Sequence, residues 1–282
     1  MRPRALSALA LGLVLLVTGC GEPGKSPEKA AAPPSASASP SPTPVTKPSP
    51  TTTPAKPKLR PVPKKLPAGL HRASGSNGVA LTFDDGPDPR FTPQILAQLR
   101  AARVKATFCV VGKQAKRYPE LVARIVREGH QLCNHSWHHD VNLGRRSAAE
   151  IRADLERTNE AIHAAAPKAP ITWFRQPGGR WTAEEVTIAK QMGLRPLHWS
   201  VDPQDWDHPP AKTIIKRVKG ATRHGSVVLM HDAGGDRAQT MAACRHLIPD
   251  LKRRYGIARL PSPAVLPGVA AMPIPVWPSV QT

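Results

Sequence analysis

The order of apolar and amphipathic segments is the strongest constraint on how this chain of 282 residues can fold. Between Val79 and about Leu260, short β-prone apolar runs alternate with longer segments that have helical periodicity. The expected strands are residues 79–83, 106–111, 131–133, 173–174, 196–199 and 227–230. The expected helices are residues 92–102, 118–128, 148–165, 182–192, 211–222 and 238–255. This alternation predicts parallel strands with right-handed helical crossovers, and therefore an α/β fold.

Capping signals support two of these helix starts. Ser147 stands three residues before Glu150, which is the spacing of a capping box. Thr182 stands three residues before Glu185 in the same way. We therefore expect one helix to begin after Ser147 and another after Thr182.

Polar residues follow five of the expected strands at the point where each strand ends. They are Asp84 with Asp85, His135, Arg175, Asp202 and His231. In barrel-like α/β folds the carboxyl ends of the strands meet on one face, where catalytic groups are found. Five motifs with the same placement predict one shared site.

Two of these motifs offer ligands for a divalent metal. Asp84 and Asp85 are adjacent, so one carboxylate can bind a metal while the other serves as a base. His135 and His139 are four residues apart, and on a helix they would share a face. Three protein ligands with open positions are typical of a catalytic metal. A tight turn at Asp84–Asp85, a solvated histidine cluster, or use of the neighbouring His138 are the alternatives.

The first 20 residues have the pattern of an export signal. A basic start precedes an apolar stretch over residues 5–17, followed by small residues up to Cys20. The run at residues 17–20 resembles a bacterial lipobox, which implies cleavage before Cys20 and lipid on its sulfur. The alternative is an ordinary signal peptide with a chance cysteine. Residues 21–74 are rich in Pro, Ser, Thr and Lys, and we expect a disordered tether. This pattern predicts an exported protein, lipid-anchored to the outer face of the bacterial cell membrane.

The formal net charge of +20 constrains the partners of the protein. A strongly basic protein binds nucleic acid, anionic lipid or an acidic polymer. The export signal argues against nucleic acid, so the charge indicates adhesion to an anionic envelope. The alternative is an arginine-rich composition with cations on solvated faces. Residues 261–282 are Pro-rich and form a separate tail.

The cysteines fit an oxidising compartment. Cys109 and Cys133 lie in expected core strands that should be neighbours, so a disulfide between them is one expectation, and two buried free thiols are the other. Cys244 lies on an expected helix, and we expect it to be buried and unpaired.

Five motifs, in order between Val79 and Asp232, resemble those of the polysaccharide deacetylase family, the NodB-homology domain of carbohydrate esterase family four. The motifs are Thr-Phe-Asp-Asp-Gly at 82–86, His-Ser-Trp-His-His at 135–139, Arg-Gln-Pro-Gly-Gly at 175–179, Asp-Pro-Gln-Asp-Trp at 202–206 and Leu-Met-His at 229–231. The resemblance implies a distorted (β/α) barrel of about seven parallel strands, occupying residues 75–260.

The resemblance also implies a role for each matching residue. Metal ligands would be Asp85, His135 and His139, usually for Zn²⁺, with Co²⁺ as an alternative. Catalytic residues would be the base Asp84, the general acid His231, Arg175 orienting Asp84, and Asp202 pairing with His231. The N–H of Gly178 would stabilise the oxyanion, and Trp206 and Leu229 would line the acetyl pocket. A structural ion pair is the alternative role for Arg175, and core packing for Trp206.

Three positions depart from the family pattern. Gly178 stands where an aromatic residue is common, and the Gly178–Gly179 pair adds flexibility that would weaken preorganisation or admit a bulkier sugar. Cys109 and Cys133 stand where Phe and Gly are frequent, which fits a disulfide.

The leading hypothesis is a metal-dependent N-deacetylase of an extracellular polysaccharide, most plainly peptidoglycan, with chitin-like oligosaccharides next, acting as a monomer. O-acetyl esterase activity and a catalytically silent glycan-binding lipoprotein are the alternatives. A two-metal phosphoesterase would need a second ligand cluster, which the sequence lacks.

Overall fold

The computed structural model describes residues 59–61 and 63–262. The predicted signal peptide with Cys20, most of the predicted tether and nearly all of the Pro-rich tail lie outside the described residues. Among the helices of the described part, none combines the length and the apolar character needed to cross a bilayer.

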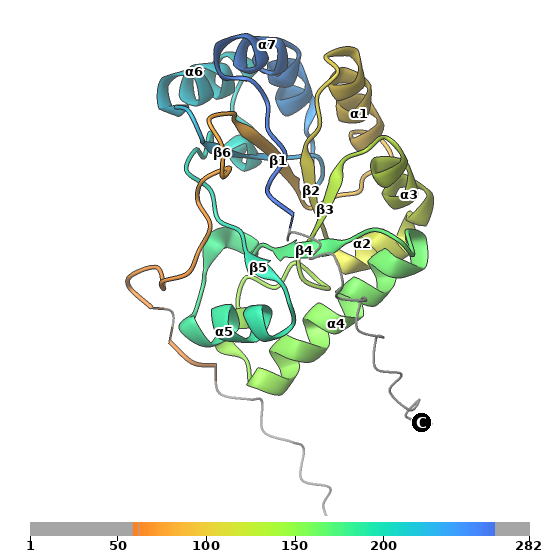
Figure 1. The fold of residues 1–282 in the computed structure, drawn as a ribbon, viewed down its shortest axis with the longest axis vertical. Helices are drawn as coiled ribbons and strands as arrows, with labels where there is room; N and C mark the ends of the chain where they lie inside the picture. The colour runs from red at the N-terminus through yellow and green to blue at the C-terminus, as the bar shows by residue number, and fades with distance from the viewer. Residues whose placement is uncertain (1–58, 62, 263–282) are drawn as a thin grey trace, which may run out of the picture. The chain divides into compact units, whose positions relative to one another are not determined.

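A single sheet of parallel strands carries the site. Its strands are β1 (Ala80–Asp84), β2 (Thr107–Val110), β3 (Gln131–Asn134), β4 (Ile171–Phe174), β5 (Arg195–Pro196) and β6 (Val227–His231). Their order across the sheet is β5-β4-β3-β2-β1-β6, and the sheet curls into a half-barrel (Figure 1). The described residues thus form the expected distorted barrel with six strands instead of about seven.

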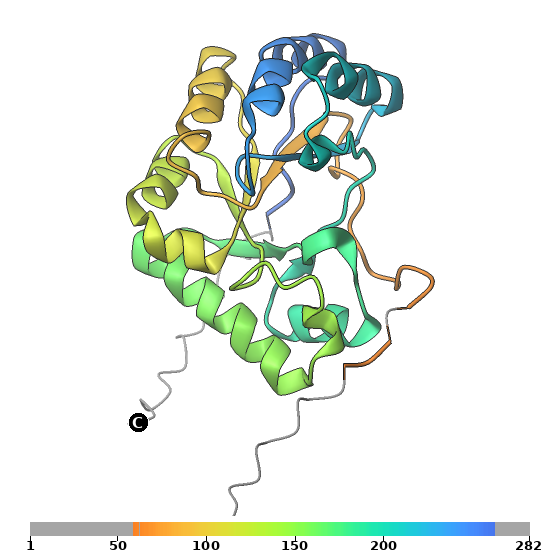
Figure 2. The same ribbon diagram turned by 180° about the vertical axis from the view of Figure 1, so that it is seen from behind.

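Helices surround the outside of the curled sheet, as the two opposite views show (Figures 1 and 2). The α-helices are α1 (Thr92–Ala101), α2 (Gly112–Arg117), α3 (Pro119–Arg127), α4 (Ala148–Ala165), α5 (Ala183–Gln191), α6 (Ala211–Ala221) and α7 (Ala238–Tyr255). Three 3₁₀ turns, η1 (Leu143–Arg145), η2 (Pro177–Gly179) and η3 (Asp205–Asp207), lie in loops that follow strands. Because all strands are parallel, these loops gather at one end of the sheet.

The apolar residues of the strands explain why the sheet is buried on both faces. All five residues of β1 and of β6 are buried, as expected for strands covered on both sides. Phe83 of β1 stacks on Phe108 of β2. Both belong to the main apolar core, together with Ile95 of α1 and Leu247 of α7. A smaller apolar cluster, which includes Trp173, groups one residue each of β1, β2, β3, β4 and β6 with Leu197 and Leu260. Burial of this apolar surface holds the strand ends in fixed relative positions.

The two cysteines of β2 and β3 stand opposite each other in the strand register. Cys109 and Cys133 form a disulfide, the first of the two alternatives that the sequence left open. Cys244 on α7 is free and buried, as expected.

The predicted helix starts are confirmed where capping residues signal them. Ser147 and Glu150 make both hydrogen bonds of a capping box at the start of α4. The Thr182 side chain accepts the N–H of Glu185 at the start of α5. The short helix α2 was not expected, because it is only six residues long and has no side-chain cap.

Candidate active site

Asp85, His135 and His139 come together at the carboxyl ends of β1 and β3. Asp85 Oδ1 lies 3.2 Å from His139 Nε2 and 3.4 Å from His135 Nε2. One ligand atom from each residue lies within 4.8 Å of the other two. This is the ligand set expected from the sequence, and it offers one carboxylate oxygen and two imidazole nitrogens on the same side.

A loop, and not a helix, brings the two histidines together. The segment after β3 has no helical turn until Leu143, and His139 adopts a left-handed φ of 59°. Asp85 has a φ of 76° and Ser136 a φ of 61°. Such conformations are costly for residues with a Cβ and cluster at functional sites. The spacing of four residues therefore predicted the correct pair of histidines, but the expected reason, a shared helix face, is wrong.

Hydrogen bonds fix the histidine loop. The Asn134 side chain accepts the N–H of Ser136 at 2.9 Å and donates to the Leu155 carbonyl of α4 at 2.9 Å. His135 Nδ1 is 2.8 Å from the Arg175 carbonyl, which can only accept, so Nδ1 carries the hydrogen. The lone pair of His135 Nε2 is then directed to the side where Asp85 lies, as a metal ligand requires.

The Asp85 carboxylate fits a bound cation. Its Oδ1 is buried and has no hydrogen-bond partner in the described residues. Burial raises the pKa of Asp85, but the nearby imidazoles of His135 and His139 lower it further, and the pKa lies well below its usual value. A buried, ionised and unpartnered carboxylate oxygen between two imidazoles matches the donor chemistry of Zn²⁺ and similar ions.

Asp84 is held by a buried guanidinium. Arg175 Nη1 donates to Asp84 Oδ1 at 2.6 Å and to Thr82 Oγ1 at 2.8 Å. The Arg175 side chain is fully buried, and its other nitrogens face the carbonyls of Leu197 and His198 at 3.4 Å. Asp84 Oδ2 faces the metal ligands, 3.6 Å from His135 Nε2. The geometry agrees with an Arg175 that orients Asp84 and leaves one oxygen free to act as a base.

Asp205, and not Asp202, pairs with His231. Asp205 Oδ1 lies 2.7 Å from His231 Nδ1, and Asp205 Oδ2 accepts the His231 backbone N–H at 3.0 Å. Thr240 Oγ1 donates to the same Oδ2 at 2.9 Å. The pairing expected for Asp202 is therefore wrong. Asp202 is exposed, and its carboxylate accepts the N–H of Gln204 in the turn that precedes η3.

The pair with Asp205 leaves His231 protonated at neutral pH. Burial lowers the pKa of His231, but the hydrogen bond and the charge of Asp205, with smaller contributions from Asp85 and Asp84, raise the pKa to about 9. An imidazolium with one nitrogen bonded to Asp205 has its other nitrogen available to donate a proton.

These groups share one cavity of about 380 Å³. The residues that line it are Asp84, Asp85, His135, His139, Gly178, Trp199, Asp202, Trp206, Leu229 and His231. Four predicted site residues are not among them: Arg175, which is fully buried, Cys109 and Cys133 of the disulfide, and Cys20, which lies outside the described residues. All the others line the cavity. Trp199 was not predicted as a site residue, although it is the last residue of the fifth expected strand.

Gly178 lines this cavity, and Gly179 follows it in the chain. Both glycines have left-handed φ values, 63° and 64°. A Cβ on Gly179 would come within 2.6 Å of the Trp199 ring, whereas a Cβ on Gly178 would meet only Val141, at 3.4 Å, and the Arg180 side chain, at 3.9 Å. Position 179 therefore requires glycine for space, while position 178 requires it only for conformation.

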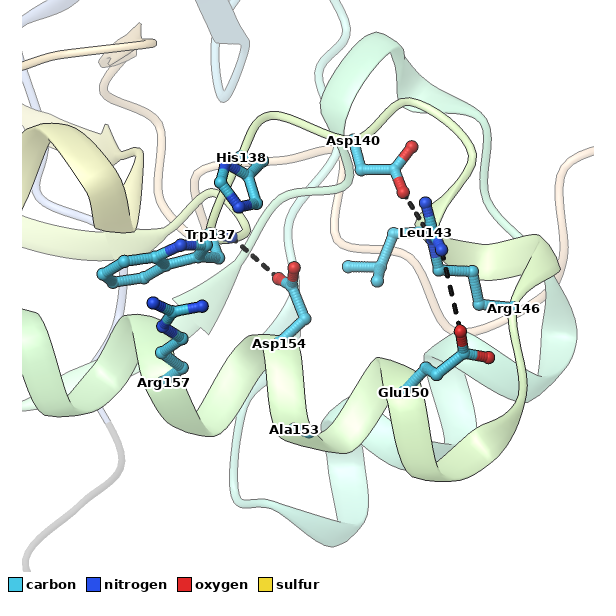
Figure 3. Close-up of a pocket in the computed structure, with 9 residues that line it drawn as sticks. All are labelled: Trp137, His138, Asp140, Leu143, Arg146, Glu150, Ala153, Asp154 and Arg157. Carbon is cyan, nitrogen blue, oxygen red and sulfur yellow. Dashed lines mark hydrogen bonds and ion pairs between the residues drawn. The ribbon is translucent and has the colours of Figure 1, made fainter. Parts of the chain in front are cut away.

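A second hollow, of about 560 Å³, lies between the histidine loop and α4 (Figure 3). The Arg157 guanidinium packs over the Trp137 ring at 3.9 Å, and the Trp137 backbone N–H donates to Asp154. Arg146 pairs with Asp140 and Glu150 across the other end. This hollow is larger than the first cavity. However, its lining includes none of the three metal-cluster residues and neither Asp84 nor His231.

The comparisons with known proteins agree with this geometry. A family model described as polysaccharide deacetylase matches residues 71–197. A chitooligosaccharide deacetylase of Sinorhizobium fredii is 40% identical over 213 residues, which cover 71% of this chain and 94% of that protein. A peptidoglycan-N-acetylglucosamine deacetylase of Bacillus cereus is 36% identical over 178 residues, 62% of this chain and 82% of the relative.

A crystal structure of a peptidoglycan N-acetylglucosamine deacetylase superposes with a TM-score of 0.64 at 36% identity, covering 68% of this chain and 90% of that one. The chain belongs to the polysaccharide deacetylase family. It is a polysaccharide N-deacetylase, a hydrolase of carbon–nitrogen bonds other than peptide bonds.

Proposed function

We propose that this deacetylase removes acetyl groups from the N-acetylated sugars of peptidoglycan. One observation carries the chemistry: the cluster of Asp85, His135 and His139 shares a cavity with a free oxygen of Asp84 and with the Asp205-bound imidazole of His231. A base, an acid and a metal site thus line one cavity, which is the set of groups that amide hydrolysis requires.

Asp85, His135 and His139 would hold the divalent ion, which we propose is Zn²⁺ with Co²⁺ as a substitute. When bound, it supplies Lewis-acid polarisation of the acetyl carbonyl and favours ionisation of water. Asp84 then accepts a proton from the attacking water through Oδ2, while Arg175 keeps Oδ1 engaged. Burial of Arg175 makes this arrangement rigid before substrate arrives.

The remaining groups serve the leaving nitrogen and the acetyl group. His231 donates the proton that turns the sugar nitrogen into an amine, and Asp205 stabilises the imidazolium before that step. Gly178 lines the cavity, and its N–H would donate to the developing oxyanion. Trp206 and Leu229 line the same cavity and would contact the acetyl methyl group.

Peptidoglycan is favoured as the substrate by two observations. One similar protein is a peptidoglycan-N-acetylglucosamine deacetylase, and the first 20 residues have the pattern of an export signal with a lipobox. A lipid-anchored exported enzyme meets the wall polymer first. Chitooligosaccharides are the next candidate, because other relatives are named for them. Esters of acetylated polysaccharides would use the same groups.

The test is acetate release from purified peptidoglycan by the zinc-loaded protein, beside chitooligosaccharide and acetylated xylan. We expect release from peptidoglycan, loss by at least about 100-fold in Asp84→Asn and in His135→Ala, and loss on chelation that zinc restores. Metal bound at one equivalent with no release from any of the three polymers would contradict the proposal. Glycan binding that is unchanged in Asp84→Asn, without turnover, would instead favour a silent binding protein.

We also propose that the protein is exported and anchored by lipid on Cys20. Support comes from the basic start, the apolar run and the small residues before Cys20. Mass spectrometry of the mature protein should find a lipid-modified Cys20 at the N-terminus, and Cys20→Ala should release the protein from the membrane fraction. An unmodified N-terminus elsewhere would contradict the anchor.

A further inference from the structure

The described domain has a strongly basic end that the catalytic chemistry does not use. Four segments, residues 100–105, 124–130, 219–226 and 250–259, contain eleven Lys or Arg residues and only two acidic ones, Glu128 and Asp250. Ten of these cations are exposed: Arg100, Arg103, Lys105, Arg127, Lys219, Arg223, Lys252, Arg253, Arg254 and Arg259. We call these ten side chains the basic face.

Hydrogen bonds, an ion pair and a ring contact join the four segments into one continuous surface. Lys252 at the end of α7 donates to the Ala102 carbonyl at the end of α1. Arg100 pairs with Glu128, which joins the end of α1 to the end of α3. Tyr255 donates to the Thr222 carbonyl, and its ring contacts His224, which joins α7 to the loop after α6. The basic face therefore runs across the carboxyl ends of four helices.

This surface lies at the opposite end of the sheet from the cavity. The helices α1, α3, α6 and α7 each end shortly before a strand begins or, for α7, before Ile257 bridges to Val79 at the start of β1. The metal ligands and His231 follow the other ends of the strands. Nine of the eleven aspartates lie there too: Asp84, Asp85, Asp88, Asp140, Asp202, Asp205, Asp207, Asp232 and Asp236. Charge is thus separated along the strand direction.

Helix dipoles alone do not explain this separation. Cations are favoured in the last turn of any helix. Yet α4 ends with only His163 as a basic residue in its last turn. Four members of the basic face, Arg103, Lys105, Arg223 and Arg259, lie outside helices altogether. Each of the two carboxylates in these segments pairs with more than one cation. Glu128 pairs with Arg100 and Arg124. Asp250 faces Lys219, Arg253 and Arg254. Most of the cations therefore have no anionic partner in the described part of the chain.

We propose that the basic face docks on the anionic phosphates of a lipid membrane surface, with the catalytic cavity directed away from the membrane. A broad surface across four helix ends suits a planar array of headgroups better than a single linear polymer. Each Lys or Arg near such a surface adds to binding, and clusters of four to eight are enough for recognition of anionic lipid. Half-buried Tyr255 at its centre has the amphipathic character suited to an interface. Docking of this kind is independent of lipid on Cys20 and would orient the enzyme toward polymer beyond the membrane.

The experiment compares three full-length proteins on vesicles of phosphatidylcholine with and without about one third phosphatidylglycerol. All three carry Cys20→Ala, so that no lipid anchor contributes to binding, and the protein with this change alone serves as wild type. The test variant carries Arg103→Glu, Arg127→Glu and Arg259→Glu, all exposed positions. The matched control carries Lys116→Glu, Arg117→Glu and Lys212→Glu, also exposed and outside the basic face. Both variants change the net charge equally, so any difference reports the position of the charges.

We expect wild type and control to sediment with anionic vesicles at low salt and to detach at high salt. The test variant should bind on the order of 100-fold more weakly, since three attractive cations are lost. Vesicle-bound wild type should still deacetylate a soluble chitooligosaccharide at the rate of the free enzyme. Equal loss in both variants, or vesicles that inhibit the soluble reaction, would overturn the proposal. Binding to a soluble phosphodiester polymer but not to anionic vesicles would also overturn the membrane assignment.

Discussion

The charge of Asp205 sets the pH range in which His231 can act as an acid. The pKa of His231 is about 9, because the hydrogen bond and the charge of Asp205 outweigh the effect of burial. A general acid must be protonated, so activity should fall as pH rises through this pKa. We expect Asp205→Asn to lower kcat by about 100-fold and to shift the basic limb of the pH–rate profile to lower pH.

Asp202→Asn is the matched control for this prediction, because it removes the same charge from the same motif. Asp202 is exposed and bonds to the turn at Gln204 and not to His231. In Asp202→Asn, the basic limb of the pH–rate profile should stay at the wild-type pH. The profile is measured as kcat/KM for acetate release. A profile that moves in Asp202→Asn and not in Asp205→Asn would contradict the assignment.

Two neighbouring glycines should respond differently to the same substitution. Gly179→Ala would force a Cβ to within 2.6 Å of the Trp199 ring, which lines the cavity, so we expect a loss of activity of at least about 10-fold. Gly178→Ala has room for its Cβ and should cost about 1 kcal/mol of stability from its left-handed φ alone. Steady-state kinetics and urea unfolding of both variants separate the effects. Equal kinetic losses would show that the ring is not held as the structure has it.

The sequence alone identified the site residues at the ends of strands. It gave the wrong partner for His231, because the conformation of a loop determines that partner. Asp84, Asp85, His135 and His231 follow strands of a parallel sheet, so their convergence follows from topology. Asp202 and Asp205 lie in one loop, and the choice between them depends on Gln204 in a left-handed conformation and on the η3 turn.

At the scale of elements, the disulfide joins β2 and β3 next to the histidine loop. Closing a loop with a sequence separation of 24 restricts the unfolded chain, which corresponds to about 3 kcal/mol of stabilisation. We expect a reductant to lower the free energy of unfolding of wild type by this amount in urea titrations. Cys109→Ala with Cys133→Ala should start lower and not respond to reductant. A reductant effect of similar size in the double variant would exclude the disulfide as its cause.

Long helices with an apolar face were predictable, and short elements were not. The sequence located α4 and α7 to the residue, since each is 18 residues long. The six-residue α2 lacks a cap, and β5 pairs over only two residues although four were expected. Tertiary contacts decide such elements: residues 197 and 198 pair with Phe174 and His71 by hydrogen bonds that local sequence does not encode.

On the scale of the whole molecule, one buried acid outside the site should govern how stability depends on pH. Glu185 in α5 is fully buried, and neither carboxylate oxygen has a hydrogen-bond partner in the described residues. Burial raises the pKa of Glu185 well above its usual value, and the charges of Asp154 and Asp140 add to this effect. The folded protein therefore holds a proton on Glu185 that the unfolded chain releases.

The sign of the effect follows from this difference. Below the unfolded pKa both states are protonated, and Glu185 has no effect on the pH dependence. Above it, the unfolded state binds fewer protons, so the free energy of unfolding falls by up to about 1.4 kcal/mol per pH unit until the folded pKa is reached. Glu185→Gln removes this ionisation, so its stability relative to wild type should increase between pH 5 and pH 8.

Urea unfolding at pH 5, 6.5 and 8, with a chelator present throughout, measures this difference without a contribution from bound metal. Glu160→Gln is the matched control, because Glu160 is an exposed carboxylate on α4 and should change stability equally at each pH. A Glu185→Gln variant whose difference from wild type stays constant across the three pH values would show that Glu185 is ionised in the folded protein. Glu185 is buried where α5 packs against the loop that carries Gly144. An ionised carboxylate at such a site would require a cation near it.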